Sequence, residues 1–319
     1  MDRYEYMKMA LAIIPKEIIS QYQILSLASY GWIYMDICKG MPGLKQSGRI
    51  VSNRLQLHLA QFGYSPVART PSLWKHTTKN ISFSLVVDNI GVKYVGKENA
   101  EYLIKNFKKL YTIFIDWNGA CYCRLTLKWN YDQRTCEISM PDYIPAALHK
   151  FQNPIPSQPQ DSPHYWKKPV YGSTIQWVDN PDDSSILTTK SITLVQKIVG
   201  TLLYYAVDAD PTRLVALESI APQKSAENQH TYDEVLWLLN YAAFHQYATI
   251  RHSTSEMILH VHSDASYIYA PKACSRAGRY YFLSNRSSNP DRAPHTNTPL
   301  NGPIHTVSKI MSNVMSSTA

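Results

Sequence analysis

The sequence lacks any paired arrangement of cysteines and any long hydrophobic run. Its five cysteines are an odd number and carry no C-x-x-C spacing: Cys38, Cys121, Cys123, Cys136 and Cys274. Such a pattern indicates neither a zinc site nor a disulfide framework, and it is typical of a reducing compartment. Without a membrane-length apolar run or a secretory signal, the chain is predicted to be intracellular, cytoplasmic or nuclear, with no membrane partner.

Charged residues are also few, at 18% of the 319 residues, yet the basic residues outnumber the acidic ones and the net charge is +8. This basic excess is compatible with a polyanionic partner but does not identify one. Hydrophobic residues make up 45% of the chain. That content is enough for one large domain or for two or three small ones.

Residues 81–95 predict a β-hairpin around which the rest of the chain is organised. Apolar and polar side chains alternate from Ile81 onward, as in a half-buried strand. Asp88 and Asn89 tolerate the backbone of a tight turn, and residues 91–95 predict the returning strand. Two interpretations stay open: Asp88 and Asn89 are turn residues only, or they hold a carboxylate at the hairpin tip for chemistry.

A glycine-rich loop precedes a predicted helix earlier in the chain. Glycines and a proline mark residues 40–49 as a loop, and Ser47 is a favourable N-cap. Apolar residues at helical spacing then predict a helix over 47–62. Lys45 and Arg49 stand near its start, which suits a phosphate group at a helix N-terminus, although an ordinary loop–helix junction explains the same residues.

The remaining elements follow from periodicity and turn residues. Helices are predicted over 97–111, 141–151, 191–207, 211–221 and 231–244, the last opening with a Thr231-x-x-Glu234 capping box. Strands are predicted over 112–115, 120–129, 135–140, 257–262, 279–284 and 304–307, with Cys121 and Cys123 on one face of the second. Prolines and acidic residues mark 152–190 as a linker. This order predicts α+β or α/β domains around a helical connection.

Together these segments resemble the pol polyprotein of LTR retrotransposons, most closely the copia-type reverse transcriptase with RNase H, over essentially the whole chain. The residues that resemble the G-L-K-Q-S motif at the base of the fingers and palm are Pro42, Gly43, Leu44, Lys45, Gln46 and Ser47, followed by Arg49. Residues 83–89 resemble the palm hairpin, whose tip usually reads aromatic-x-Asp-Asp. Residues 199–204 resemble the V-G-S-L-L-Y segment between the domains, and residues 262–266 resemble the first active-site strand of RNase H.

The resemblance implies an architecture and a division of the chain. The expected fold is a partial reverse-transcriptase palm of antiparallel sheet and helices, then a helical connection, then an incomplete RNase H-like sheet. The corresponding ranges are 1–151 for the partial reverse transcriptase and 152–190 for a proline-rich linker. The helical connection is expected over 191–250 and the N-terminal part of an RNase H-like domain over 251–319.

The resemblance also implies RNA-directed DNA polymerase and RNase H activities, both of which use Mg²⁺ ions held by carboxylates. The expected catalytic and metal-binding residues are Asp88, beside the degenerate position Asn89, and Asp264. Residues 42–47 and Arg49 are expected against the nucleotide and the template. The implied partners are an RNA template, a DNA primer, an RNA–DNA hybrid and a deoxynucleoside triphosphate (dNTP).

The sequence departs from the family pattern at the catalytic positions. Asn89 stands where a second aspartate is usual, and its uncharged amide oxygen is a weaker Mg²⁺ ligand. Val86 replaces the usual aromatic residue. The aspartate of the first palm strand is expected upstream of Met1, and the RNase H glutamate beyond Ala319. We therefore expect a truncated, catalytically impaired copy; the alternative is a non-enzymatic remnant that binds nucleic acid weakly.

Overall fold

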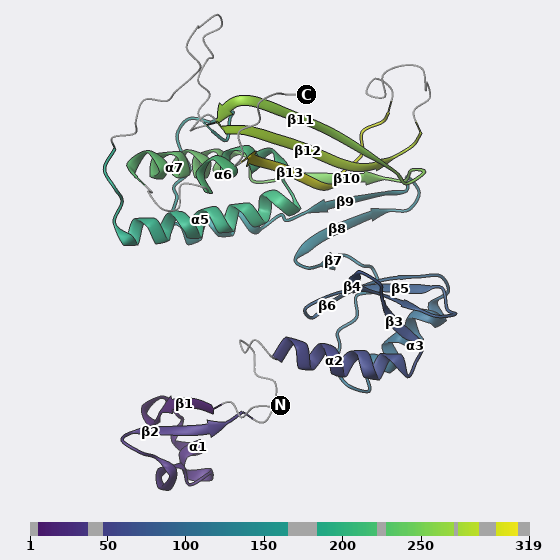
Figure 1. Cartoon of the computed structure of the whole chain (residues 1–319), viewed down its shortest axis with the longest axis vertical. Helices are drawn as coiled ribbons and strands as arrows, with labels where there is room; N and C mark the ends of the chain where they lie inside the picture. Colours follow the sequence, from purple (N-terminus) through teal and green to yellow (C-terminus); the bar gives the residue numbers. More distant parts are fainter. Residues whose placement is uncertain are drawn as a thin grey trace, which may run out of the picture. The chain divides into compact units, whose positions relative to one another are not determined.

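The structure, a computed structural model, describes residues 6–37, 47–164, 184–221, 228–270, 274–286 and 298–311. It combines helices with four sheets, and every strand pair within these ranges is antiparallel. The general α+β class predicted from the sequence is therefore confirmed. The chain divides into two compact units, residues 1–115 and 116–319, and this boundary lies inside the predicted range 1–151 (Figure 1).

The first described segment is a β-hairpin with short helices inserted between its strands. Its elements are β1 (Tyr6–Ala10), η1 (Leu11–Ile13), α1 (Lys16–Gln21), η2 (Ile24–Leu27) and β2 (Trp32–Asp36), with β1 paired to β2. Three buried side chains form its core: Ile14, Ile24 and Ile33. Alternation along β2 turns Ile33 into this core, whereas Trp32 and Tyr34 stay exposed on the opposite face.

A four-stranded sheet backed by two helices forms the rest of the first unit. Its elements are α2 (Ser47–Ala60), β3 (Tyr64–Val67), β4 (Thr70–His76), β5 (Ile81–Val86), β6 (Asn89–Tyr94) and α3 (Lys97–Phe107), and the strand order is β3-β4-β5-β6. The helices bury Leu55, Leu59, Leu103 and Phe107 against Phe83 of the sheet. The predicted helices 47–62 and 97–111 are thus confirmed, although each ends a few residues early.

The second unit begins with a sheet and a layer of helices. Its elements are β7 (Cys121–Tyr122), β8 (Leu125–Asn130), β9 (Thr135–Ser139), α4 (Tyr143–Lys150), α5 (Thr189–Asp208), η3 (Pro211–Arg213), α6 (Leu214–Ile220), α7 (Gln229–Phe244) and β10 (Thr249–Ser253). The helix predicted over 191–207 is confirmed as α5, and its residues Val195, Ile198, Leu202 and Tyr205 are all buried. β10 pairs with β9, so the sheet order is β10-β9-β8-β7.

A long three-stranded meander completes the unit. β11 (Ile258–Ala270) pairs with β12 (Cys274–Ser284), and β12 pairs with β13 (Pro303–Met311). All three strands are longer than the predicted segments 257–262, 279–284 and 304–307. One consequence is that Asp264 lies inside β11 rather than just beyond a strand end.

Two strand predictions between residues 112 and 129 are wrong. Residues 112–115 form no strand, although their side chains alternate between exposed and half-buried. The predicted strand 120–129 is broken by a turn at Cys123 and Arg124, whose φ angles are 50° and 66°. Because two consecutive positive φ angles define a tight hairpin turn, Cys121 and Cys123 do not share one strand face.

The start of α7 also differs from the prediction. Asn228, and not Thr231, caps the helix: its side-chain oxygen accepts a hydrogen bond of 3.1 Å from the backbone N–H of Thr231. Thr231 is fully buried inside the first turn. The T-x-x-E pattern was therefore misplaced by three residues, since asparagine is an equally good N-cap.

Part of the predicted linker lies against α7. The indole nitrogen of Trp237 donates a 2.9 Å hydrogen bond to the carbonyl oxygen of Ser162. A ring nitrogen of His245 is 2.9 Å from the carbonyl oxygen of Gln160. The described residues 152–164 are thus irregular in backbone but attached to the helical layer.

Candidate functional site

The structure places Asp88 at the tip of the predicted hairpin, but the turn lies one residue earlier than the predicted pair Asp88 and Asn89. β5 and β6 pair in register from Ile81 with Tyr94 to Val86 with Asn89. The turn consists of Val87 and Asp88, and both side chains are exposed. β6 therefore begins at Asn89, two residues earlier than predicted.

The backbone of the turn is strained beside the carboxylate. Val87 has a φ of 55°, a left-handed conformation that glycine adopts freely and a β-branched residue adopts rarely. Its side chain is 93% exposed, so no packing interaction compensates for the strain. Strained residues of this kind persist where the surrounding structure holds them. Here the paired strands on both sides force the turn.

Aromatic packing at the base of the hairpin holds β5 in place. Phe83 is 1% exposed and stacks on Trp74 with ring centroids 5.6 Å apart and planes 10° from parallel. Phe107 of α3 contacts the same ring edge-to-face at 5.7 Å. Such aromatic pairs stabilise a core beyond the area that they bury. The strand that leads to Asp88 is therefore anchored by buried aromatic side chains at its base.

The carboxylate of Asp88 is hydrogen-bonded to the side-chain amide of its neighbour. Nδ2 of Asn89 donates a 3.0 Å hydrogen bond to Oδ1 of Asp88. Asp88 and Asn89 are thus brought together, but as an amide–carboxylate pair rather than as two metal-binding carboxylates.

The described residues do not fit a centre for two Mg²⁺ ions at this tip. Such a centre needs several charged oxygen ligands around ions roughly 3.5–4 Å apart. Across the described ranges, no group of three or more His, Cys, Asp or Glu side chains is arranged to hold a metal ion. Asp88 contributes one charged ligand, and Asn89 contributes none.

Most of the predicted glycine-rich loop lies outside the described residues. Pro42, Gly43, Leu44, Lys45 and Gln46 lie outside the described residues. Ser47 starts α2, and the side chain of Arg49 in its first turn is exposed. The helix start predicted after this loop is thus confirmed, while the contact of the loop with a nucleotide or template stays a prediction.

Asp264 lies in the second unit on the long strand β11. It pairs with Gly278 of β12, and its exposed carboxylate accepts a 2.8 Å hydrogen bond from the N–H of Ala265. Its strand neighbour Ser266 accepts a hydrogen bond from the N–H of Arg276. Within the described ranges, Asp264 belongs to no group of three or more His, Cys, Asp or Glu side chains that could hold a metal ion.

A carboxylate that the sequence did not single out organises the loop after the first unit. Asp116 accepts hydrogen bonds from the backbone N–H groups of Asn118 at 3.0 Å, Ala120 at 2.7 Å and Cys121 at 3.2 Å. The bond from Ala120 is the main reason that the pKa of Asp116 lies below its usual value. The D-x-N-G spacing before β7 signals this turn, because aspartate side chains cap nearby backbone amides. Its role is structural.

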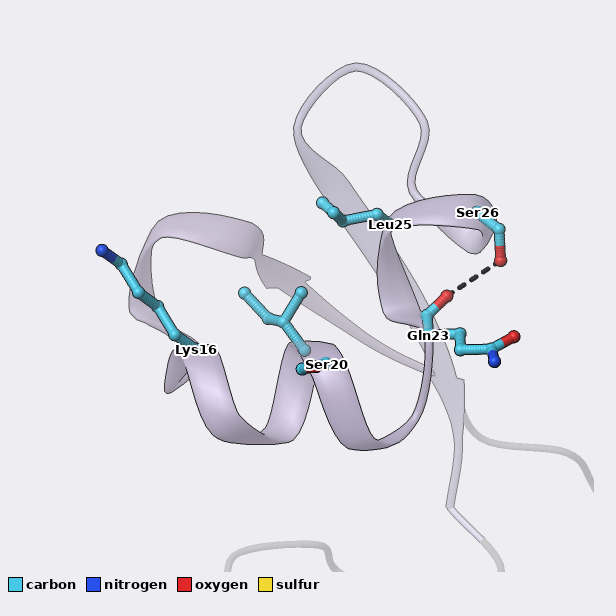
Figure 2. Close-up of a pocket in the computed structure, with 6 residues that line it drawn as sticks. Lys16, Ser20, Gln23, Leu25 and Ser26 are labelled. Atoms are coloured by element: carbon cyan, nitrogen blue, oxygen red, sulfur yellow. Dashed lines mark hydrogen bonds between the residues drawn. The ribbon is translucent and has the colours of Figure 1, made fainter.

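A shallow concavity of about 650 Å³ lies between α1 and η2 (Figure 2). Lys16 and Ser20 line it from α1, and Leu25 and Ser26 line it from η2. The hydroxyl of Ser26 donates a 2.8 Å hydrogen bond to the carbonyl oxygen of Gln23. No acid–base pair or metal-ligating pair faces this concavity, so it offers no chemistry that competes with the hairpin tip.

Comparison with protein-family models, with curated protein sequences and with solved structures found no match to this chain. Among the described residues, no helix combines the length and the apolar character that crossing a membrane requires.

Proposed function

We propose that the chain is a copia-type reverse-transcriptase and RNase H polypeptide that binds an RNA template, a DNA primer and their hybrid. In this proposal its polymerase centre is impaired, because the hairpin tip offers one carboxylate where two are needed for Mg²⁺ and the dNTP. The chain works on nucleic acid inside the cell, in the cytoplasm or the nucleus.

The observation that carries this proposal is the position of Asp88. It stands at the exposed tip of a two-residue hairpin turn, on a sheet backed by α2 and α3. A carboxylate at such a tip reaches out of the sheet toward a bound duplex, and the resemblance assigns that role to this hairpin. Asn89 next to it supports the impaired form, since its amide neutralises no charge on a metal or a phosphate.

Basic side chains at the C-terminal end of α3 supply the charge for binding. Lys105 lies in the last turn of α3, Lys108 and Lys109 directly follow the helix, and all three side chains are exposed. Lysine binds phosphate groups without reading sequence, and such contacts position a nucleic acid rather than select it. We therefore assign non-specific backbone binding to these three lysines.

Binding to a short RNA–DNA hybrid at increasing salt tests this assignment. If two or three phosphates are contacted, the affinity should fall about 10- to 40-fold between roughly 50 and 200 mM salt. Replacing all three lysines with glutamine should flatten this dependence. Lys97→Gln on the same helix is the matched control, because Lys97 pairs with Glu101 at 3.9 Å. Binding that is independent of salt would contradict the proposal.

Primer extension and hybrid cleavage test the impaired centre. With Mg²⁺ or Mn²⁺, the unmodified chain should neither extend a primer nor cut the RNA of a hybrid, since one carboxylate cannot position two ions. Template-dependent extension that Asp88→Ala abolishes would mean that Asp88 has carboxylate partners beyond those described.

A further inference from the structure

The outer face of the β1–β2 hairpin carries a cluster of exposed aromatic side chains. Alternate residues of a strand share a face, and the antiparallel register sets Lys8 opposite Tyr34 and Tyr6 opposite Asp36. Tyr6, Trp32 and Tyr34 are 64%, 41% and 63% exposed on this face. The helices α1 and η2 pack on the other face, through the core around Ile33 (Figure 1).

These rings are not needed to fill the core of the hairpin, which consists of Ile14, Ile24 and Ile33 with partly buried neighbours. Trp32 and Tyr34 instead present large, rigid surfaces to the surroundings. Exposed apolar groups gathered in this way mark an interaction surface. The question is which partner the face fits.

The position of Lys8 indicates the chemistry of the partner. Its ammonium nitrogen lies 4.5 Å from the ring centroid of Trp32 and 5.9 Å from that of Tyr34. A cation therefore stands among aromatic rings on an exposed sheet face. Protein surfaces that bind single-stranded nucleic acids combine aromatic rings with positive charge, because the bases stack on the rings and the phosphates pair with the cations.

We propose that this face binds single-stranded nucleic acid, with unpaired bases stacked on Trp32 and Tyr34 and a phosphate paired with Lys8. Positions two apart on a strand are about 6.5 Å apart, so each ring has room for its own base. Stacking of this kind is tolerant of sequence. This inference rests on the proposed function, in which the chain's partner is nucleic acid. It adds that the bound nucleic acid is single-stranded and names the residues that contact it.

Asp36 bears on where along the hairpin a bound nucleic acid would lie. It shares the face with Tyr6, and its negative charge disfavours phosphates at that end of the hairpin. The bound backbone therefore passes Lys8 and Trp32 rather than Tyr6. Asp36→Asn should tighten binding, since it removes the repulsion and leaves the three rings in place.

The test is fluorescence anisotropy of a labelled oligothymidylate of about 12 nucleotides, within the range of site sizes for such surfaces, titrated with the full chain. Trp32→Ala and Tyr34→Ala should each weaken binding about 5- to 100-fold, the range measured when a base loses its stacking partner. Trp32→Phe should keep most of the affinity, because a ring remains. Trp32→Leu should lose it, although leucine preserves an apolar side chain for folding.

Tyr22→Ala is the matched control. Tyr22 is 63% exposed, like Tyr34, but follows α1 rather than lying on the outer face of the hairpin. Its replacement should leave the affinity for the oligonucleotide unchanged. An equal loss for Tyr22→Ala and Tyr34→Ala would overturn the proposal, because any exposed tyrosine would then suffice.

Two further outcomes separate this inference from the proposed function. If the chain binds the RNA–DNA hybrid but Trp32→Leu and Tyr34→Ala leave the oligonucleotide affinity unchanged, the inference fails and the proposed function stands. A drop in thermal stability of these variants at unchanged affinity would identify the face as a protein-packing surface instead. If the chain binds neither ligand, both fail.

Discussion

Nε of Arg213 donates a 2.7 Å hydrogen bond to Oδ2 of Asp210, and both side chains are buried in the helical layer of the second unit. A terminal nitrogen of the same guanidinium donates to the carbonyl oxygen of His245, at the end of α7. The rings of Tyr205 and Tyr241 flank it with centroids 4.9 and 5.5 Å away. One arginine thus joins η3, α5 and α7.

Arg213→Ala should lower the free energy of unfolding by about 3–5 kcal/mol, because it leaves Asp210 as a buried charge without its partner. Urea denaturation followed by circular dichroism measures the change. The control is Arg251→Ala in the same unit, where the exposed guanidinium bonds Gln133 and the loss should stay below about 1 kcal/mol. Similar losses for both variants would argue against a special role of the buried pair.

Asn89→Asp should raise the affinity of the hairpin tip for Mn²⁺ without producing primer extension. The substitution removes the amide that bonds Asp88 and adds a second charged ligand. Two neighbouring carboxylates still lack the further ligands that two-ion catalysis requires. Electron paramagnetic resonance of free Mn²⁺ measures binding, and Asp88→Ala should remove the gain. Extension by Asn89→Asp alone would contradict the expectation.

Val87→Gly should stabilise the first unit by roughly 0.5–1 kcal/mol. Glycine relieves the strain of a φ of 55°, and this gain exceeds the entropy that glycine adds to the unfolded chain. Val86→Gly, one residue earlier inside β5, has no such strain to relieve and should destabilise by about 0.5–1 kcal/mol. The midpoint temperatures of thermal unfolding of the two variants should therefore shift in opposite directions from that of the unmodified chain. Shifts of the same sign would refute the strain argument.

The stability of the first unit should fall as the pH falls, partly through His76. Burial, followed by the charge of Lys79, lowers the pKa of His76 from 6.5. Its Nδ1 also accepts hydrogen bonds from the backbone N–H groups of Thr78 and Lys79, at 3.1 and 3.0 Å. The unfolded chain therefore takes up the proton first. The contribution of His76 to the free energy of unfolding is complete above pH 6.5. It is lost as the pH falls through the lowered pKa of His76 in the folded chain.

His76→Asn tests this dependence, because an asparagine oxygen can accept the same bonds without titrating. The free energy of unfolding of the variant should vary less between about pH 7 and pH 5. Burial also lowers the pKa of His164 and His252, so the comparison is the difference between the variant and the unmodified chain. Identical pH profiles would exclude His76 as a contributor.

Local patterns in the sequence determined much of the helical structure and the tip of the central hairpin. α2, α3 and α5 were predictable because their apolar residues recur at helical spacing, and the hydrogen bonds of a helix join residues close in the chain. The hairpin that presents Asp88 was predictable from the alternation of its strand, but its turn lies one residue earlier than Asp88 and Asn89, because the pairing of β5 with β6 places Val87 and Asp88 in it. The candidate site therefore had a sequence signal at Asp88 and Asn89.

Tertiary structure decided which strands pair and which charges are buried. Residues 112–115 have the alternation of a strand but no partner, while β10 becomes a strand by pairing with β9, more than a hundred residues earlier in the chain. Whether a segment pairs as a strand depends on which sheet edge is free in the folded chain. A short stretch of sequence does not contain that information. The same holds for Arg213, whose burial nothing in the local sequence indicates. In the folded chain, Asp210, His245 and two tyrosines surround its guanidinium. A charge is stable in a core only where the fold supplies its partners, and the fold alone specifies where that is.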